Sequence, residues 1–207
     1  NNLGIRRATG EYILLLNSDT VLEDDSLDRC VQRLDADKEL GAIHPSLIGF
    51  DGQPQECYYS FPNIGQRIWK AIRGTGGRCD TRTQGIGWLA GTALMIRRKA
   101  FEQIGLAMDD NHFMYWEDAD LSARLLKAGW KIEEYKHTRV RHFGGASGGG
   151  PDAVRRSDLY AWYAWGELRF FAKHRPAWEA ILVWLLDFFD LFRRALRGLL
   201  RKNRRGE

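Results

Sequence analysis

Three carboxylates follow a run of aromatic residues in the middle of the chain, and they are this sequence's best candidates for acid–base chemistry. They are Glu117, Asp118 and Asp120, within the segment Phe-Met-Tyr-Trp-Glu-Asp-Ala-Asp-Leu-Ser-Ala-Arg at residues 113–124. Apolar residues recur at helical spacing after them, which predicts a helix from about Glu117 to Ala128. Acidic side chains at a helix start are also favoured by its exposed N–H groups and dipole, so simple capping is the alternative interpretation.

The spacing of these acids separates their roles. Glu117 and Asp120 fall on one face of the helix, and Asp120 can pair with Arg124 one turn later. Asp118 lies about 100° round from Glu117 and is free to point elsewhere. Asp118 is therefore the carboxylate that is free to act, with Glu117 beside it as a second catalytic candidate.

Several motifs occur in the order that is typical of one enzyme family. Residues 116–124, Trp-Glu-Asp-Ala-Asp-Leu-Ser-Ala-Arg, resemble the E-D-x-D-L-x-x-R signature of family 2 glycosyltransferases, which have the GT-A fold. The segment 12–19, Tyr-Ile-Leu-Leu-Leu-Asn-Ser-Asp, resembles the approach to that family's metal-binding D-x-D position. The segment Trp88-Leu-Ala-Gly-Thr92 and His142 follow in the expected order. The pattern is most similar to bacterial rhamnosyltransferase-like enzymes of cell-surface polysaccharide assembly, over about residues 1–174.

The resemblance implies an inverting transfer of a sugar from a nucleotide-diphosphate donor to a hydroxyl of a glycan or lipid-linked acceptor. Such a transfer needs one base to deprotonate the acceptor hydroxyl, and we expect Asp118 to be that general base. It also implies a divalent cation, Mg²⁺ or Mn²⁺, held by Asp19 and His142, because the departing diphosphate gathers negative charge. Asn17 stands where the family has the first acid of D-x-D, so it would support the site or contact the ribose. Without the resemblance, Asn-Ser-Asp-Thr is also a turn-forming sequence and His142 an ordinary hydrogen-bonded residue.

The resemblance also assigns substrate contacts. Donor-binding candidates are Asn2, Asn17, Asp19, Arg155 and Arg156. Acceptor-binding candidates are Trp88, Gly91, Thr92, Trp116 and Glu117. Two alternatives stay open: Gly91 can be only a bend, and the glycine-rich segment 143–151 can be an ordinary linker rather than a flap that closes over the diphosphate.

The predicted architecture is α/β, a partial GT-A-like, mostly parallel sheet flanked by helices, with a C-terminal amphipathic helical appendage. Short apolar runs at residues 12–16 and 93–96 predict buried strands, and 131–135 and 138–142 read as two more. Residues 53–84 show no clear periodicity and are expected to form a long loop. We expect residues 1–150 to be the C-terminal part of the catalytic domain and 151–207 a helical extension. The chain opens inside what would be a βα connection, so we expect an N-terminally truncated and, in isolation, inactive fragment.

The segment from Trp178 to Leu200 predicts an amphipathic helix. Its polar residues cover about a third of the circumference and are Glu179, Asp187, Asp190, Arg193, Arg194, Arg197 and Arg201. The apolar stretch ends at Asp187, short of the roughly 20 residues that span a membrane. We expect this helix to lie on the inner face of the plasma membrane, which makes the protein cytoplasmic and peripheral. The alternative is that its apolar side packs on the catalytic domain or in a homodimer.

Composition limits the other possibilities. The chain has 207 residues, 44% of them hydrophobic, which is ample for a packed core. The three cysteines, Cys30, Cys57 and Cys79, lack zinc or disulfide spacing and fit a reducing compartment. A nucleic-acid-binding module could use the basic, aromatic C-terminus, but no nucleic-acid motif accompanies it, so we expect no nucleic-acid partner. A catalytically inactive scaffold with the same fold is the other alternative.

Overall fold

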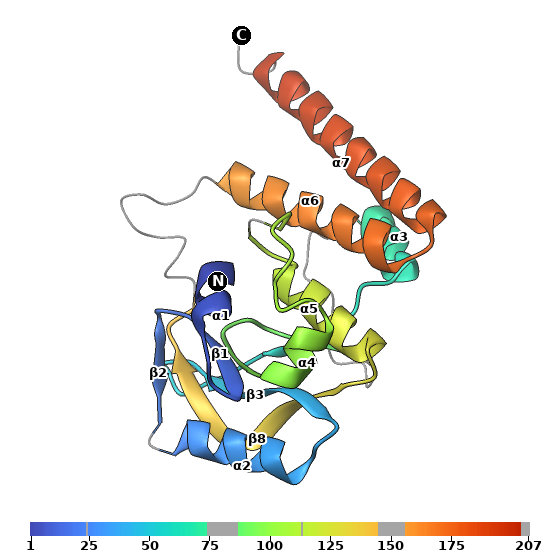
Figure 1. Ribbon diagram of the computed structural model, residues 1–207. Coiled ribbons are helices and arrows are strands. Elements are labelled where there is room, and N and C mark those ends of the chain that lie inside the picture. The colour runs from blue at the N-terminus through green and yellow to red at the C-terminus, as the bar shows by residue number, and fades with distance from the viewer. Residues whose placement is uncertain (24, 74–86, 113, 145–155, 204–207) are drawn as a thin grey trace. The chain divides into compact units, whose positions relative to one another are not determined.

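The computed structural model describes residues 1–23, 25–73, 87–112, 114–144 and 156–203 (Figure 1). The chain divides into two compact units. The first comprises residues 1–61 and 81–163, and the second comprises residues 62–80 and 164–207. The boundary near residue 150 between the catalytic domain and the helical extension stays a prediction.

The first unit is built on a sheet of six strands in the order β1-β7-β3-β8-β2, with β4 paired to β3, beside a two-stranded sheet of β5 and β6. The strands are β1 (Tyr12–Leu16), β2 (Thr20–Leu22), β3 (Leu40–Ile48), β4 (Pro54–Gln55), β5 (Tyr58–Ser60), β6 (Gly87–Leu89), β7 (Ala93–Arg97) and β8 (Lys131–His142). The helices of this unit are α1 (Asn2–Arg7), α2 (Ser26–Ala36), α4 (Arg98–Gln103) and α5 (Glu117–Lys127). The predicted α/β architecture is confirmed, and so is the predicted helix that begins at Glu117.

The large sheet is mixed rather than mostly parallel. Among its described ladders, β3 with β8 is parallel, whereas β1 with β7, β3 with β7, β3 with β4 and β2 with β8 are antiparallel. A short apolar run predicts a buried strand but carries no information on direction, which is why the sequence did not reveal this.

Helices lie on both faces of the large sheet (Figure 1), and alternate residues of its strands bury against them. On one face, Leu94 and Ile96 of β7 join Phe101 of α4 and Leu121 and Leu125 of α5 in the main core cluster. On the other face, Met95 packs with Cys30 and Leu34 of α2. Each fully buried aliphatic side chain stabilises the fold by about 1.5–3 kcal/mol relative to its exposure, so these faces fix the helices on the sheet.

Two local predictions were wrong. Residues 131–142 form one strand, β8, because its pairing with β3 jumps from Pro45–Tyr135 to Ser46–Arg139 and so accommodates residues 136–138 as an irregularity. The expected long loop contains β4, β5 and the helix α3 (Ile64–Arg73). The apolar residues of α3 do recur at helical spacing, but the glycines and prolines around them obscured the pattern.

The second unit consists of α3, the C-terminal half of α6 (Arg156–His174) and α7 (Ala177–Asn203). Phe171 of α6 and Ala180 and Val183 of α7 form its buried core, against which Ile64 and Leu168 pack. Across the described residues, no helix combines the length and the apolar character needed to cross a membrane.

Candidate active site

The acidic helix α5 begins from an unusual backbone. Tyr115 and Trp116, which immediately precede Glu117, have φ values of 71° and 72°. Bulky residues rarely adopt this left-handed conformation, and each such residue costs about 1–3 kcal/mol that the surroundings must offset. Trp116 is buried and its ring lies 5.3 Å from that of Tyr163, which supplies part of that packing. This backbone directs the two acids that follow it.

Two side chains on successive turns of α5 fasten the helix to residues 89–91, which comprise the last residue of β6 and the two that follow it. The N–H of Gly91 donates to Oδ2 of Asp118 at 3.1 Å, and the N–H of Leu89 donates to Oγ of Ser122 at 3.1 Å. Four residues of helix rise about 6 Å and two residues of strand about 6.6 Å, so the two spacings match. Oδ1 of Asp118 also accepts the N–H of Ala119 at 2.8 Å. The expected base is therefore held in one orientation.

The environment of Asp118 suits a base at neutral pH. Burial, with the negative charge of Glu117 as the second cause, raises the pKa of Asp118 to about 7, against the opposing hydrogen bonds from Gly91 and Ala119. Burial also raises the pKa of Glu117, and its Oε2 is buried without a hydrogen-bond partner among the described residues. A carboxylate with a pKa near the working pH is the most effective general base, so Asp118 fits that role better than a surface acid.

Asp19 and His142 lie together at the β2–β8 edge. The pairing of Thr20 with His142 brings the strand ends together, and the N–H of Phe143 donates to the carbonyl of Asp19 at 3.0 Å. Oδ2 of Asp19 is 3.4 Å from Nε2 of His142. The structure thus places side by side the two residues predicted to bind the cation.

Gln55 of β4 is a functional candidate that the sequence reasoning missed. Its Nε2 donates to the carbonyl of His142 at 3.1 Å, which fixes the amide so that Oε1, 2.9 Å from Nδ1, accepts the imidazole proton. His142 then presents its Nε2 lone pair toward Asp19. A glutamine after Pro54 carries no recognisable signal in a single sequence, because only the β3–β4 turn brings it to the end of β8.

These atoms fit a divalent cation. A carboxylate oxygen and an imidazole nitrogen without a proton both offer lone pairs, and two neighbouring ligands of one octahedral cation lie about 3 Å apart. The separation of 3.4 Å between Asp19 and His142 is close to this value. Gln55 supplies the outer hydrogen bond that usually orients a metal-binding histidine.

The start of α5 and the Asp19–His142 pair lie at the same end of the sheet, where β1 and β8 end. Leu16 at the end of β1 pairs with Ala93 at the start of β7, and the N–H of Asn17 donates to the carbonyl of Thr92 at 2.9 Å. Thr92 follows Gly91, which holds Asp118. Three segments far apart in the sequence thus converge where strand ends gather ligands in α/β sheets.

Comparison with known proteins decides the family. The sequence pattern of glycosyl transferase family 2 matches residues 1–105, about half of the chain. The chain belongs to glycosyl transferase family 2. This confirms the resemblance drawn from the acidic helix and the segment 12–19.

Curated relatives agree with this family, and a solved structure shares the fold. The chain is 28% identical to N-acetylglucosaminyl-diphospho-decaprenol L-rhamnosyltransferase of Mycobacterium tuberculosis over 94% of its own length and 67% of the relative's. It is also 28% identical to the O-antigen biosynthesis protein RfbC of Myxococcus xanthus, covering 79% of this chain and 13% of that protein. The fold matches GalNAc-T7, solved with UDP, GalNAc and Mn²⁺, with a TM-score of 0.52 and 14% identity. The match covers 82% of this chain and a third (33%) of that chain.

The other predicted donor residues of this family 2 chain lie as follows. The amide of Asn2 is engaged by the loop before α5: its Oδ1 accepts the N–H of Met108 at 2.8 Å, and its Nδ2 donates to the Met108 carbonyl and to Asp110. Asn17 is exposed just after β1. Arg156 is the first residue of α6, and Arg155 lies outside the described residues. Their roles in donor binding stay predictions.

Three of the predicted acceptor residues, Trp88, Gly91 and Thr92, belong to the segment that contacts Asp118. The ring of Trp88 stacks on Tyr59 at 4.6 Å, and Thr92 is buried. Gly91 uses its N–H to hold Asp118, and a Cβ added there would meet the Asp118 side chain at an ordinary distance of 3.8 Å. The backbone of Gly91 thus orients the Asp118 side chain. The sequence did not predict this contact. Contact of these residues with an acceptor stays a prediction.

The predicted pair of Asp120 with Arg124 is present, at 2.8 Å. Arg124 also donates to the carbonyls of Ile104 and Ala107, so the pair fixes the preceding loop to α5. Ligand atoms of Asp109, His112 and Asp120 lie within 4.8 Å of one another and form a second group able to hold a cation. The Arg124 guanidinium already compensates the charge of Asp120, and the cation site at Asp19 and His142 stays the prediction.

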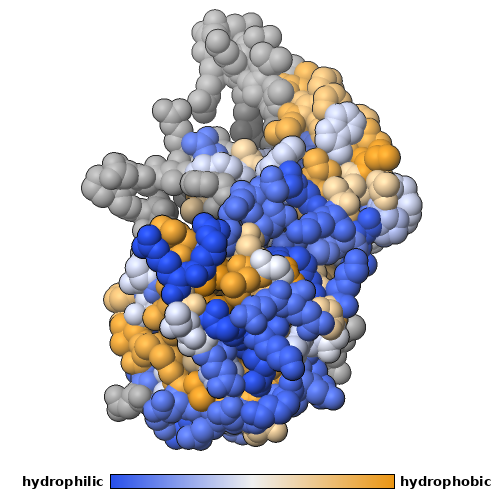
Figure 2. Space-filling model, in the orientation of Figure 1, coloured by the Kyte–Doolittle hydropathy of each residue, from blue (hydrophilic) through white to orange (hydrophobic). Residues whose placement is uncertain are grey.

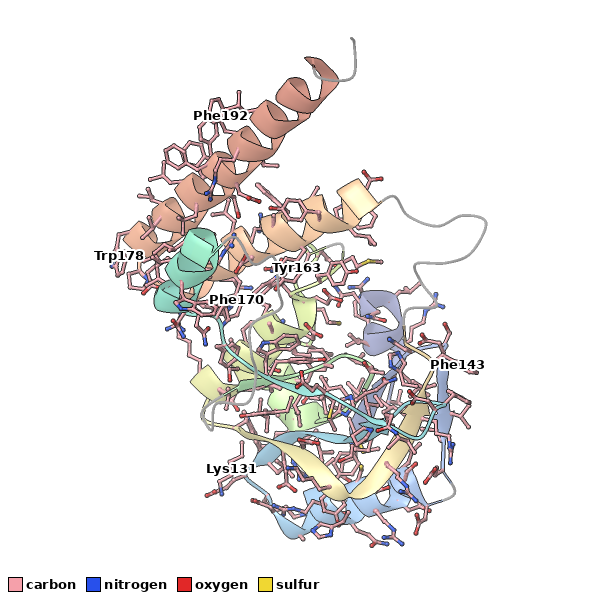
Figure 3. The ribbon with its side chains drawn as sticks, turned by 180° about the vertical axis from the view of Figure 1, so that it is seen from behind. Lys131, Phe143, Tyr163, Phe170, Trp178 and Phe192 are labelled. Carbon is pink, nitrogen blue, oxygen red and sulfur yellow. The ribbon has the colours of Figure 1, made fainter. Side chains whose placement is uncertain are left out.

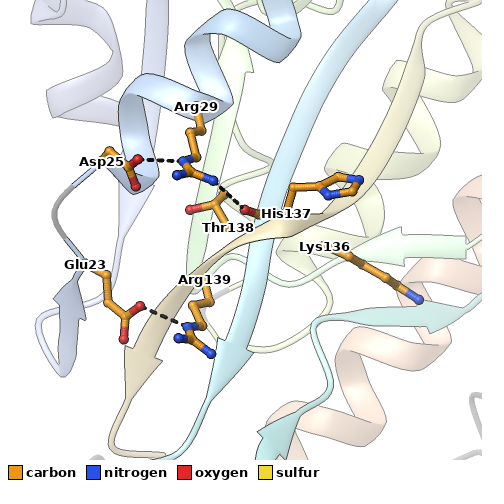
Figure 4. A pocket seen from close by; sticks show the side chains of 7 residues that line it. All are labelled: Glu23, Asp25, Arg29, Lys136, His137, Thr138 and Arg139. Atoms are coloured by element: carbon orange, nitrogen blue, oxygen red, sulfur yellow. Dashed lines mark hydrogen bonds and ion pairs between the residues drawn. The ribbon is translucent and has the colours of Figure 1, made fainter.

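A surface hollow of about 310 Å³ lies elsewhere, between β8 and the segment from the end of β2 to α2 (Figure 4). Its charged lining is largely paired within itself: Arg29 with Asp25 at 2.6 Å and Arg139 with Glu23 at 3.0 Å. None of the predicted catalytic, donor or acceptor residues lines it. We therefore do not assign the reaction to this hollow.

Replacing Gln55 tests the assignment of the cation site without measuring catalysis. Gln55→Leu removes the acceptor of the His142 imidazole proton, so affinity for Mn²⁺ should fall by about 10- to 100-fold. Gln55→Glu keeps an acceptor and should recover part of the loss. Gln53→Leu, at an exposed turn position nearby, is the matched control. Titration followed by Mn²⁺ electron paramagnetic resonance measures all four proteins, and equal affinity of the Gln55→Leu and parent proteins would contradict the assignment.

Proposed function

We propose that this protein is an inverting glycosyltransferase that moves a sugar from a nucleotide-diphosphate donor to a hydroxyl of a lipid-linked acceptor in cell-surface polysaccharide synthesis. The observation that carries this proposal is that Asp118, whose pKa is raised to about 7, is fixed at the same end of the sheet as the Asp19–His142 pair. The similarity to an enzyme named for rhamnosyl transfer to N-acetylglucosaminyl-diphospho-decaprenol supports the acceptor class.

In the proposed reaction, one carboxylate is sufficient as the base. Asp118 removes the proton of the acceptor hydroxyl while the hydroxyl oxygen attacks the anomeric carbon. The bond between that carbon and the diphosphate oxygen breaks on the opposite side, and the electron pair leaves with the nucleoside diphosphate. The configuration at the anomeric carbon inverts, and no covalent sugar–enzyme intermediate is needed. Glu117, whose Oε2 is buried without a hydrogen-bond partner in the described part of the chain, would orient the acceptor.

Asp19 and His142 would hold Mg²⁺ or Mn²⁺ in this proposal. When bound, the cation supplies positive charge that neutralises the departing diphosphate. The residues of the chain do the rest: Gln55 keeps the Nε2 lone pair of His142 directed to the site, and Asn17 supports Asp19 from the end of β1. Asn2, Arg155 and Arg156 are the proposed additional donor contacts.

The acceptor class suggests where the reaction takes place. A lipid-linked acceptor is confined to a membrane surface, so we propose that the protein works as a peripheral protein at the cytoplasmic face of the plasma membrane. Trp88, Thr92 and Trp116 flank the base and are the proposed acceptor contacts.

The proposal is tested by product analysis. The complete enzyme, supplied with Mn²⁺, a lipid-linked N-acetylglucosaminyl diphosphate and a panel of nucleotide-diphosphate sugars that includes rhamnose donors, should extend the acceptor by one sugar. Mass spectrometry gives the added sugar, and nuclear magnetic resonance gives its anomeric configuration. A product with the donor's configuration, or donor hydrolysis without acceptor extension, would contradict inverting transfer.

A further inference from the structure

The second unit turns the charged side of α7 inward. Arg67 of α3 lies between two acids: its Nε is 3.1 Å from Glu167 of α6, and its Nη2 pairs with Asp187 of α7. All three side chains are largely buried, and Arg193 farther along α7 donates to the Ala71 carbonyl of α3 at 3.3 Å. Breaking a buried ion pair by removing one partner is strongly destabilising. The ion pairs of Arg67 therefore fix which side of α7 faces α3 and α6.

The opposite side of α7 is apolar and exposed. Eight large side chains along it are between 47% and 59% exposed. They are Trp178, Ile181, Trp184, Phe188, Phe189, Leu191, Phe192 and Leu196. Figure 3 shows Trp178 and Phe192, near the two ends of this set, on the side of α7 that faces away from α6. Apolar side chains also gather along the described part of α7 in Figure 2.

This arrangement is the reverse of ordinary packing for an amphipathic helix. Such a helix normally buries its apolar stripe and exposes its charges, and soluble monomers rarely expose a large contiguous apolar patch. The eight side chains extend along 19 residues, about 27 Å of helix. The surface therefore calls for an apolar occupant.

The charges at the end of the chain select that occupant. Between Leu191 and Gly206 the sequence has seven arginines and lysines and no acid. A second copy of the chain would carry the same positively charged end, whereas anionic phospholipid supplies both an apolar interior and opposite charge. From the inward ion pair and the outward apolar side, we infer that α7 is a docking surface for an anionic bilayer, lying in its interface.

This inference places α7 on the same membrane as the lipid-linked acceptor of the proposed function, but it stands on separate observations. Docking needs neither donor nor cation, so binding to vesicles without acceptor tests it alone. Failure of docking would leave glycosyl transfer untouched, and failure of transfer would leave docking untouched.

Flotation of the full chain with lipid vesicles tests the inference. The protein should float with vesicles of phosphatidylcholine and phosphatidylglycerol, at least about tenfold more than with phosphatidylcholine alone, and less at about 0.5 M salt. Trp184→Glu with Phe188→Glu should abolish flotation, whereas Leu3→Glu, at an equally exposed leucine on α1, should not. Replacing Arg201, Lys202, Arg204 and Arg205 by Gln should reduce flotation only with the anionic vesicles.

Circular dichroism and sedimentation complete the experiment. The substituted side chains are already more than half exposed, so the Trp184→Glu and Phe188→Glu protein should keep its helix content. Absence of flotation in a folded parent protein would overturn the inference. It would also be overturned if the parent were a dimer that fails to float and that the double substitution dissociates, because α7 would then bind a second copy.

Discussion

In the complete enzyme, Asp118→Asn should lower turnover by on the order of 10²- to 10⁴-fold, because an amide cannot take the proton of the acceptor hydroxyl. Donor binding should change little, since Asp118 does not contact the Asp19–His142 pair directly. Steady-state rates and calorimetric donor binding measure the two effects. If Glu117→Gln is inactive and Asp118→Asn is active, the roles of the two acids are reversed.

The structure adds a stability cost to this prediction. The side-chain amide of the Asp118→Asn protein would have one oxygen for the two N–H groups of Gly91 and Ala119, so the variant should unfold with about 1–2 kcal/mol less free energy. Ser122→Ala is the matched control, because it removes the neighbouring bond to Leu89 on the same helix. Its stability should fall by a similar amount while its turnover stays within about tenfold. A comparable collapse of turnover in both variants would show that fastening of the helix, rather than the base, is being measured.

The same residue sets the pH dependence. Because Asp118 must be ionised to accept a proton and its pKa is raised to about 7, kcat/KM should rise with pH and level off above that value. Its effect on stability has the opposite sign. A carboxyl whose pKa is raised by folding stabilises the folded state fully below its unfolded pKa, and that contribution is lost as pH rises through about 7. The Asp118→Asn protein should lack this part of the pH dependence.

Removal of the cation should abolish activity. A chelator should stop turnover, Mg²⁺ or Mn²⁺ should restore it, and Asp19→Ala should weaken donor binding measured in the presence of Mn²⁺. Glu23→Gln is the matched control, because Glu23 follows the other end of β2 and pairs with Arg139 and Arg141 instead. Full activity in excess chelator would contradict the assignment of Asp19 and His142 to a cation.

The parts of the site that depend on helical spacing were predictable from the sequence. A helix places residues four apart on one face, so the bounds of α5 and the Asp120–Arg124 pair followed from the pattern alone. The closeness of Asp19 and His142 followed only from family resemblance, because their contact depends on the antiparallel β2–β8 pairing. Gln55 could not be predicted, since its position depends on the β3–β4 turn and on the end of β8 together.

The C-terminal helix shows the same limit. The sequence separates a polar from an apolar side of residues 178–200, but it does not say which side faces the neighbouring helices. That choice depends on Arg67, 120 residues before Asp187 in the chain and inside a segment expected to be a loop. Long-range ion pairs of this kind leave no periodic trace in the sequence.

The fastening of α5 to residues 89–91 also protects a sheet margin. β6 pairs with β5 on one side, where the N–H of Ala90 continues the ladder to the Cys57 carbonyl at 2.8 Å. On its other side, the N–H groups of Leu89 and Gly91 would be open to a strand from another molecule, as unpaired strand edges are in general. Asp118 and Ser122 accept hydrogen bonds from those N–H groups, as the carbonyls of a neighbouring strand otherwise would. Asp118 thus also prevents a strand of another molecule from pairing at this margin. A substitution of Asp118 by a residue that cannot accept hydrogen bonds should therefore lower solubility as well as activity.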